Sequence, residues 1–244
     1  MEFNTFYDLC KEIFSVNTGL PPIDEDKANK LYLLTNRMLD VNKTMNLTAI
    51  KEEKAIILRH YADSLMISEH LAANSSIIDV GCGAGFPTLP LAIFRPDLQI
   101  TALDSTAKRI EYVRQTTELL GLNNVTAIAE RAECIGNSKD YREQFDYATA
   151  RAVAALPILT ELCLPFVKIG GQFVAMKAQK GTDEVSASKT AIKKCGGDLT
   201  HSIVKSLIDI DKSAENRTIV VISKCAQTPR EYPRHYSKIS KKPL

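Results

Sequence analysis

Three glycines at alternate positions form the part of the sequence best suited to chemistry. Gly81, Gly83 and Gly85 follow an apolar run that contains Asp79, and another apolar segment comes after them. Glycine tolerates tight turns and leaves no side chain in the way, so this arrangement brings backbone close to a nucleoside at the start of a helix. Asp104 ends a second apolar run 19 residues after Gly85, near the spacing of about 20 residues at which a carboxylate accepts hydrogen bonds from ribose hydroxyls. These two signals predict a nucleoside-binding α/β domain.

The residues around the glycines favour one cofactor over another. A dinucleotide-binding loop has the pattern G-x-G-x-x-G, but this chain has Phe86 at the position of the third glycine. Asp79 adds negative charge beside the place where a pyrophosphate would bind, whereas the amine and sulfonium of S-adenosylmethionine are cationic. We therefore expect S-adenosylmethionine as the cofactor. A nicotinamide cofactor, or a structural turn without a ligand, are the alternatives.

Composition and cysteine spacing limit the class of protein. Of the 244 residues, 45% are hydrophobic and 25% are charged, which is ordinary for a globular chain. The six cysteines form no Cys-x-x-Cys or Cys/His cluster, the shortest gap being that from Cys134 to Cys163, so neither a disulfide framework nor a metal site is expected. The sequence has no basic leader and no apolar run of membrane-spanning length. We expect a soluble, cytoplasmic monomer that binds no metal and no membrane.

The net charge of +2 is unevenly distributed along the chain. From Lys224 to the C-terminus, four lysines and two arginines face one acid, a local charge of +5, which leaves 2 − 5 = −3 for the rest. This segment also contains Tyr232 and Tyr236. Its composition suits an extended basic and aromatic strip in which tyrosines stack on RNA bases and cations neutralise phosphates. A solvated, partly disordered C-terminus is the alternative.

Hydrophobic periodicity divides the sequence into two parts. Within residues 1–72, apolar residues recur at helical spacing in 3–14, in a helix capped by Asp24, and in about 52–72. From Ser76 onward, strands alternate with helices, which predicts a doubly wound, mostly parallel sheet covered on both faces. After the strand before Gly81, the expected strands are 99–104, 124–129, 145–150, 172–177 and 217–223, and the expected helices are 88–94, 107–120, 156–167 and 184–194. We therefore expect an N-terminal helical extension, 1–72, and a cofactor-binding domain, 73–244, with the basic tail.

Several segments together resemble one known family. They are Asp79-Val80-Gly81-Cys82-Gly83-Ala84-Gly85-Phe86-Pro87, Leu103-Asp104-Ser105, Arg131-Ala132-Glu133, Thr149-Ala150-Arg151-Ala152, Asn46-Leu47-Thr48, Arg59-His60-Tyr61-Ala62-Asp63-Ser64-Leu65 and Thr228-Pro229-Arg230-Glu231-Tyr232-Pro233-Arg234. The chain is similar in these segments to the RsmG (GidB) family, from about Asn46 to the C-terminus. The resemblance implies a class I S-adenosylmethionine-dependent methyltransferase fold (Rossmann-like). It also implies methyl transfer to N7 of a guanine in bacterial small-subunit (16S) ribosomal RNA, so the expected partner is that RNA or the small ribosomal subunit.

The resemblance also assigns roles to individual residues. The expected cofactor-binding residues are Gly81, Gly83, Gly85, Phe86, Asp104, Ser105, Ala132, Glu133 and Arg151. The expected RNA-binding residues are Asn46, Arg59, His60, Lys177, Arg230 and Arg234. Guanine N7 has a lone pair and no proton at neutral pH, so methylation needs positioning rather than a general base. Arg151, His60 and Asn46 are the candidates for that positioning.

Other interpretations of these residues stay open in the sequence. His60 could pair with Asp63 one helical turn away, Asn46 could order its loop, and Lys177 and Arg151 could form ion pairs. A methyltransferase for a small molecule or a protein is a second functional hypothesis. A non-catalytic RNA-binding assembly factor that keeps a nucleoside pocket is a third.

Overall fold

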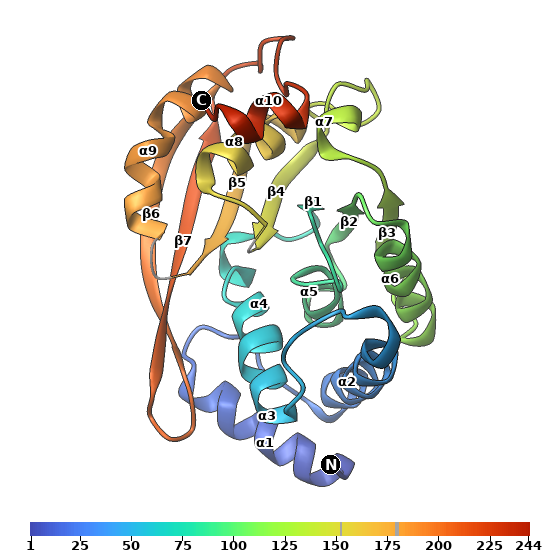
Figure 1. Cartoon of the computed structure of the whole chain (residues 1–244). Helices are drawn as coiled ribbons and strands as arrows, with labels where there is room; N and C mark the ends of the chain where they lie inside the picture. The colour runs from blue at the N-terminus through green and yellow to red at the C-terminus, as the bar shows by residue number, and fades with distance from the viewer. Residues whose placement is uncertain (152, 179–180) are drawn as a thin grey trace.

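A seven-stranded sheet forms the centre of the computed structural model, which describes residues 1–151, 153–178 and 181–244 (Figure 1). The strand order is β3-β2-β1-β4-β5-β7-β6. The strands are β1 (Ser76–Val80), β2 (Gln99–Asp104), β3 (Val125–Ala129), β4 (Phe145–Arg151), β5 (Val167–Lys177), β6 (Gly197–Ile208) and β7 (Ala214–Lys224). The first five strands pair in parallel, and β7 pairs antiparallel with both β5 and β6. The expected doubly wound, mostly parallel sheet is confirmed.

The strand order changes direction at β1, and this determines where a ligand can bind. From β1 the chain continues outward to β2 and β3 on one side, and later to β4 and β5 on the other. The loops that leave the carboxyl ends of β1 and β4 therefore separate from each other, and a crevice opens between them. The glycine turn follows β1 at this point.

Helices cover both faces of the sheet, so its central strands are buried on both sides. The helices of the cofactor-binding part are α5 (Thr88–Phe94), α6 (Ala107–Leu119), α7 (Ala132–Ile135), α8 (Leu156–Cys163), α9 (Gly181–Lys194) and α10 (Tyr236–Lys241), with a 3-10 turn at Leu164–Phe166. Neighbouring strand residues face opposite sides: Ile77 and Val174 pack in the cluster with α5 and α6, and Ile78 and Phe173 in the cluster with α8 and α9.

The N-terminal helices pack against the same core as the sheet. They are α1 (Phe3–Val16), α2 (Glu25–Met45), α3 (Glu53–Ile56), a π-helical segment (Ile57–Ala62), α4 (Asp63–Leu65) and a 3-10 turn (Ser68–His70). Phe6, Leu31 and Tyr61 are fully buried in one cluster with Leu89 and Val113. The apolar core is thus continuous across residue 72, and the division of the chain at this residue stays a prediction.

Most expected elements are found, with differences that have physical causes. Asp24 caps α2 as expected, since its carboxylate accepts a hydrogen bond from Lys27 N at 2.9 Å. The single helix expected over 52–72 is wrong in detail, because it is interrupted by the π-helical segment. The helix expected over 156–167 ends at Cys163, and β5 begins at Val167.

The C-terminal region differs most from expectation. The structure has a long β6/β7 hairpin in place of one late strand. β6 was not expected because it is a largely exposed edge strand without a buried apolar run. The extended basic strip expected for the tail is wrong. Tyr232 is only 6% exposed, Ile239 of α10 is buried in the core, and α10 packs against α8 (Figure 1). No helix in the described part of the chain is long and apolar enough to span a membrane.

Candidate active site

The turn after β1 depends on its glycines. Gly81, Gly83 and Gly85 have φ values of 79°, 57° and 87°, in the left-handed region that other residues rarely adopt. A Cβ atom at Gly81 would come within 2.7 Å of the Val153 side chain, and one at Gly85 within 2.5 Å of Leu89. A Cβ atom at Gly83 would have no described atom within 4 Å, although Gly83 lines a cavity. The turn therefore leaves room for a ligand at Gly83.

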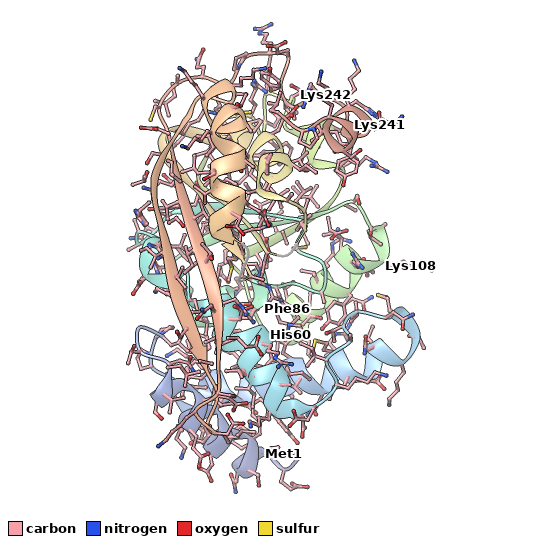
Figure 2. The ribbon with its side chains drawn as sticks, turned by 60° about the vertical axis from the view of Figure 1, so that its left-hand side comes forward. Met1, His60, Phe86, Lys108, Lys241 and Lys242 are labelled. Carbon is pink, nitrogen blue, oxygen red and sulfur yellow. The ribbon has the colours of Figure 1, made fainter. Side chains whose placement is uncertain are left out.

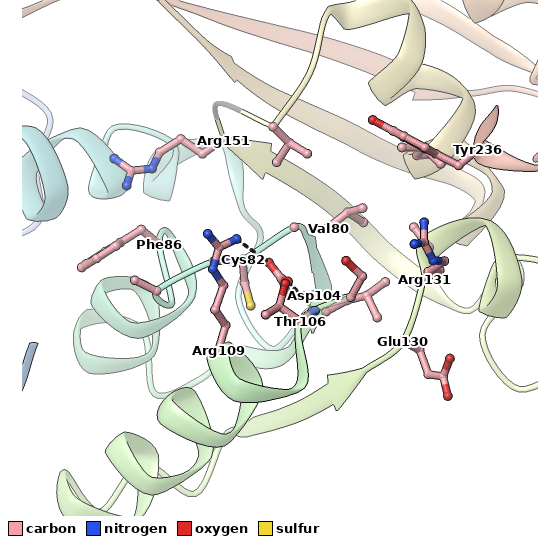
Figure 3. A pocket seen from close by; sticks show the side chains of 18 of the residues that line it. Val80, Cys82, Phe86, Asp104, Thr106, Arg109, Glu130, Arg131, Arg151 and Tyr236 are labelled. Atoms are coloured by element: carbon pink, nitrogen blue, oxygen red, sulfur yellow. Dashed lines mark hydrogen bonds and ion pairs between the residues drawn. The ribbon is translucent and has the colours of Figure 1, made fainter. Parts of the chain in front are cut away.

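A cavity of about 510 Å³ opens beside this turn, and we call it the cofactor cavity (Figure 3). Nearly all the expected cofactor-binding residues line it: Gly81, Gly83, Phe86, Asp104, Ser105, Ala132, Glu133 and Arg151. Gly85 does not line the cavity but shapes the turn. His60 lines it as well. Within the described residues, no group of three His, Cys, Asp or Glu side chains is arranged to hold a metal ion.

Asp104 lies at the end of β2 with its carboxylate at the cavity wall. Its two oxygens accept hydrogen bonds from Gly83 N at 3.0 Å and from Thr106 N at 2.8 Å. The Arg109 Nη1 atom lies 3.9 Å from Asp104 Oδ2 (Figure 3). A carboxylate has about four lone-pair positions, so Asp104 both fixes the glycine turn and can accept further hydrogen bonds from a ligand.

Glu133 is buried and also lines the cofactor cavity. Its Oε1 atom has no hydrogen-bond partner within the described chain. The Arg131 Nη1 atom lies 3.7 Å from this oxygen, too far for a hydrogen bond. A buried acceptor without a partner is costly, so this oxygen suits a ligand that donates a hydrogen bond, such as an exocyclic amine.

Asp79 lies beneath the glycine turn and is fully buried. Its Oδ2 atom accepts hydrogen bonds from the Thr88 hydroxyl at 2.7 Å and the Thr88 N–H at 3.3 Å, while Oδ1 has no partner among the described residues. Burial raises the pKa of Asp79 to about 6, against the lowering effect of the Thr88 hydrogen bonds. A cationic group bound nearby would stabilise the ionised form.

Three side chains stack at the edge of the cofactor cavity. The imidazole of His60 lies parallel to the Phe86 ring, with centroids 4.5 Å apart (Figure 2). The Arg151 guanidinium lies 5.3 Å from the centroid of the same ring. Burial, with a further contribution from the positive charge of Arg151, lowers the pKa of His60 to about 3. His60 is therefore neutral at physiological pH.

The partners of His60 determine its tautomer. Arg151 Nη2 lies 3.2 Å from His60 Nδ1, and a guanidinium can only donate, so Nδ1 is the acceptor. The proton is then on Nε2, which donates to the Thr48 hydroxyl at 2.9 Å. Both ring nitrogens are thus occupied, and the expected alternative in which His60 pairs with Asp63 is wrong.

Asp63 instead binds two arginines. One oxygen accepts from Arg151 Nη1 and the other from Arg217 Nε, each at 3.0 Å. Arg151 also donates to the carbonyl oxygen of Arg59 at 2.9 Å. Arg59 in turn pairs with Glu215 at 2.6 Å. The alternative that Arg151 forms an ion pair is therefore confirmed. Arg151 also lines the cofactor cavity.

The remaining RNA-binding candidates lie in different surroundings. Asn46 is exposed at the end of α2 with φ 50°, and Arg230 is exposed on the tail. Lys177 is buried and donates to the Ala154 carbonyl at 2.6 Å, and it pairs with Glu184 at 2.9 Å. The structure thus brings His60 and Arg59 close to the cofactor cavity but gives Lys177 internal partners.

Arg234 also has internal partners. Its guanidinium donates to both oxygens of Glu161, at 2.8 and 2.6 Å, and the Glu161 side chain is fully buried. Arg142 holds the same part of the tail by donating to the carbonyl oxygens of Thr228 and Tyr232. Arg234 therefore anchors the tail to α8.

Sequence reasoning gave no cofactor role to several residues that line the cofactor cavity. Among them, Leu47 comes from the loop after α2. Arg109 comes from α6 and Tyr236 from α10 (Figure 3). In the sequence, the Asn46-Leu47-Thr48 segment stands out only through its resemblance to the family. In the structure, the Thr48 hydroxyl accepts a hydrogen bond from His60. No periodicity in the sequence indicates that the tail returns to this cavity.

Comparison with known proteins agrees with this geometry. Similar chains named ribosomal RNA small subunit methyltransferase G include one from Lactobacillus delbrueckii subsp. bulgaricus, 40% identical over 93% of this chain and 95% of its own. Another from Alkaliphilus oremlandii is 43% identical over 91% and 92%, and one from Clostridium perfringens is 39% identical over 98% and 99%.

Solved structures share the fold at much lower sequence identity. A protein of Galdieria sulphuraria, provisionally named a sarcosine dimethylglycine methyltransferase, has 12% identity and a TM-score of 0.51 over 72% of this chain and 89% of its own. A provisionally named transferase of Pyrococcus horikoshii has 12% identity and a TM-score of 0.53 over 66% of this chain and 62% of its own. The fold is that of class I S-adenosylmethionine-dependent methyltransferases. The family model described as "GidB: rRNA small subunit methyltransferase G" matches residues 27–211, and the chain belongs to this family.

Proposed function

We propose that this protein transfers a methyl group from S-adenosylmethionine to N7 of a guanine in small-subunit (16S) ribosomal RNA. The observation that carries the proposal is the cofactor cavity, in which three features converge: a glycine turn, the Asp104 carboxylate and a Glu133 oxygen without a hydrogen-bond partner among the described residues. This chain also belongs to a family of small-subunit ribosomal RNA methyltransferases. The substrate is 16S ribosomal RNA or the small subunit, and we expect a monomer acting in the cytoplasm.

The residues of the cofactor cavity fit an adenosine that carries a cationic tail. Asp104 would accept hydrogen bonds from the ribose hydroxyls, with Ser105 beside it. Glu133 and Ala132 would lie next to the adenine, whose amine could donate to the Glu133 Oε1 atom, which accepts no hydrogen bond within the described part of the chain. Gly81, Gly83 and Phe86 would contact the rest of the cofactor, and Gly85 maintains the turn. Asp79 supplies buried negative charge that favours a cation. When bound, the cofactor supplies a methyl group already activated on a sulfonium.

The chemistry needs orientation and exclusion of water. Guanine N7 holds a lone pair at neutral pH, so no side chain has to remove a proton. His60 is suited to orienting the reacting groups because its ring is neutral and is fixed by hydrogen bonds with Thr48 and Arg151. It stacks on the Phe86 ring, and the Arg151 guanidinium lies over the same ring, 5.3 Å from its centroid. Precise alignment of reacting groups is worth up to roughly 7–11 kcal/mol of the barrier.

For RNA binding we propose the exposed candidates. Asn46 and Arg230 are exposed, and Arg59 has a half-exposed side chain near the cofactor cavity. Contacts to phosphates would make binding strongly dependent on salt. Lys177 and Arg234 would contribute indirectly, since they hold the segments that surround the site.

Calorimetry and a transfer assay test the proposal together. We expect the purified protein to bind S-adenosylmethionine and to transfer its labelled methyl group to 16S ribosomal RNA or small subunits. Cofactor binding without transfer to any RNA would favour the assembly-factor hypothesis. Transfer only to small molecules or proteins would favour the second enzyme hypothesis.

A further inference from the structure

Tyr236, the first residue of α10, lines the cofactor cavity from the C-terminal tail (Figure 3). It is 38% exposed, whereas Ile239, one helical turn further along the same face of α10, is fully buried. The face of α10 that carries both residues therefore points toward the protein. Because Tyr236 lines the cofactor cavity, part of its exposed surface is available to a ligand there.

The segment that leads into α10 is fixed next to α7. Asn137, just after α7, donates from its Nδ2 atom to the Pro233 carbonyl oxygen at 3.3 Å. Tyr232 is buried in the core cluster against which Ala132 packs. Because α7 begins with Ala132 and Glu133, the tail approaches the cofactor cavity from the side of these two residues.

The Tyr236 ring borders the end of the cofactor cavity proposed for the adenine. Figure 3 shows Tyr236 on the same side of the cavity as Arg131, and Phe86 on the other side. Arg131 directly precedes Ala132 and Glu133, the residues expected beside the adenine. A base bound there would lie within reach of the tyrosine ring.

Two anchors hold the backbone on either side of Tyr236. Before it, Arg234 donates to both oxygens of the buried Glu161, at 2.8 and 2.6 Å. After it, Ile239 is fully buried in the core. A side chain presented from a fixed backbone loses little freedom when a ligand binds, so its contacts add to affinity.

The groups around the ring suit a flat base with a polar edge. Ala132 and Leu162 line the same cavity and are apolar. The Glu133 Oε1 atom is buried and accepts no hydrogen bond from the described residues. An adenine could place its face against an aromatic ring while its amine donates to this oxygen. The ribose and the amino-acid part of the cofactor have no such face.

We propose that Tyr236 stacks on the adenine of the bound cofactor, so that the C-terminal tail forms one wall of the adenine site. This inference rests on the proposed function and adds to it a residue that no motif of the sequence assigns to the cofactor. The stack is made with S-adenosylmethionine and with S-adenosylhomocysteine alike, because both carry the same adenine. The tail then contributes to cofactor affinity as well as to the stability of the fold.

An RNA base is the other possible partner of the ring, since tyrosines also stack on exposed bases. The lining of the cavity favours the adenine. Tyr236 shares one cavity with Asp104, Gly83 and Glu133, which together fit an adenosine. An RNA base stacked on the inner face of the ring would have to occupy the place of the cofactor.

Affinity measurements test the stack. We expect Tyr236→Ala to weaken binding of S-adenosylmethionine and of S-adenosylhomocysteine about tenfold by calorimetry, because a base–aromatic stack is lost. Tyr236→Phe keeps the ring and should stay within about twofold of wild type. Lys238→Ala, at an exposed position on the same helix, is the matched control with unchanged affinity. Thermal melting without ligand shows whether each variant is folded.

Fluorescence reports the contact directly, because the sequence contains no tryptophan. Tyr236→Trp introduces a single tryptophan at the proposed stack, and Tyr7→Trp introduces one on α1, at the other end of the molecule (Figure 1). We expect adenosine and S-adenosylhomocysteine to quench the emission of the Tyr236→Trp protein, and methionine to leave it unchanged. The Tyr7→Trp emission should respond to none of them.

Two results would overturn the stack and leave the proposed function standing. One is a folded Tyr236→Ala protein that binds S-adenosylhomocysteine with wild-type affinity. The other is Tyr236→Trp emission that 16S ribosomal RNA quenches and adenosine does not. Wild-type protein that methylates no RNA, although the Tyr236 variants lose cofactor affinity as expected, would instead refute the proposed function and keep the stack.

Discussion

His60 and Phe86 stack face to face, with ring centroids 4.5 Å apart and planes only 7° from parallel. His60 comes from the π-helical segment of the N-terminal part, and Phe86 from the turn after β1. The contact therefore joins the N-terminal helices to the cofactor cavity. Because Arg151 and Thr48 occupy both ring nitrogens of His60, the stack is held in one orientation.

This arrangement predicts how activity depends on pH. With a His60 pKa of about 3, caused by burial and by Arg151, the imidazole does not titrate at physiological pH. We expect kcat for methyl transfer to be constant between about pH 6 and pH 8.5, because no general base is required. An activity step near the ordinary histidine pKa that disappears in His60→Asn would contradict the positioning role.

The same pKa shift affects stability in a defined direction. A histidine whose folded pKa lies below its ordinary value of 6.5 contributes stability above that pH, and the contribution is lost as pH falls toward about 3. His60→Asn should therefore show a shallower loss of stability than wild type as pH is lowered in this window. Urea unfolding of both proteins at a series of pH values measures the difference.

Asp79 predicts the opposite trend. Burial raises its folded pKa from 3.8 to about 6, so the stability that this group contributes is complete below 3.8 and lost as pH rises through about 6. The Asp79→Asn variant has no such ionisation. Relative to wild type, its free energy of unfolding should increase by about 3 kcal/mol between low and neutral pH. Denaturation curves of the two proteins that keep a constant separation across this range would refute the assignment.

Gly83 and Gly121 form a matched pair for testing the glycine turn. Both have positive φ, 57° and 63°, and neither would bring a Cβ atom within 4 Å of a described atom. Alanine at either position should cost a similar 1–2 kcal/mol of backbone strain, roughly. Only Gly83 lines the cofactor cavity. We expect Gly83→Ala to weaken S-adenosylmethionine binding at least roughly tenfold by calorimetry, and Gly121→Ala to leave it unchanged. Equal affinities in the two variants would show that the ligand does not approach Gly83.

Arg234 and Arg230 separate anchoring of the tail from RNA binding. Arg234→Ala leaves the fully buried Glu161 carboxylate without its ion-pair partner, which should destabilise the fold by about 3–5 kcal/mol. Arg230 is exposed, so Arg230→Ala should keep the melting temperature of wild type and instead weaken RNA binding with a smaller salt dependence. Thermal melting and RNA titration at several salt concentrations test both. A stable Arg234→Ala protein with weakened RNA binding would restore the sequence-based role of Arg234.

The sequence predicted the parallel sheet and most of the cofactor cavity, because these depend on local patterns. Glycines before a helix, and acids at the ends of β1 and β2, are close in sequence to the elements that position them. The apolar runs of the central strands β1 and β2 are short and almost fully buried, as expected for strands covered on both faces.

The parts that were missed depend on contacts between distant segments. Tyr236 reaches the cofactor cavity because distant residues anchor the tail, among them Glu161, which pairs with Arg234, and Arg142. The partner of His60 is Thr48, which lies across a loop, rather than Asp63 on the same helix. The ion pair of Arg217 with Asp63 spans more than half of the chain. Periodicity and spacing do not report such tertiary contacts.

Mapping of methylated nucleotides tests the central claim most directly. Unmodified 16S ribosomal RNA, free and in small subunits, is incubated with the protein and S-adenosylmethionine carrying a labelled methyl group, then digested and analysed by mass spectrometry. We predict one labelled nucleotide, a 7-methylguanosine, and its loss when Gly83 is replaced by alanine. A label found on another base or on another guanine atom, or no label at all with a cofactor-bound protein, would contradict the account.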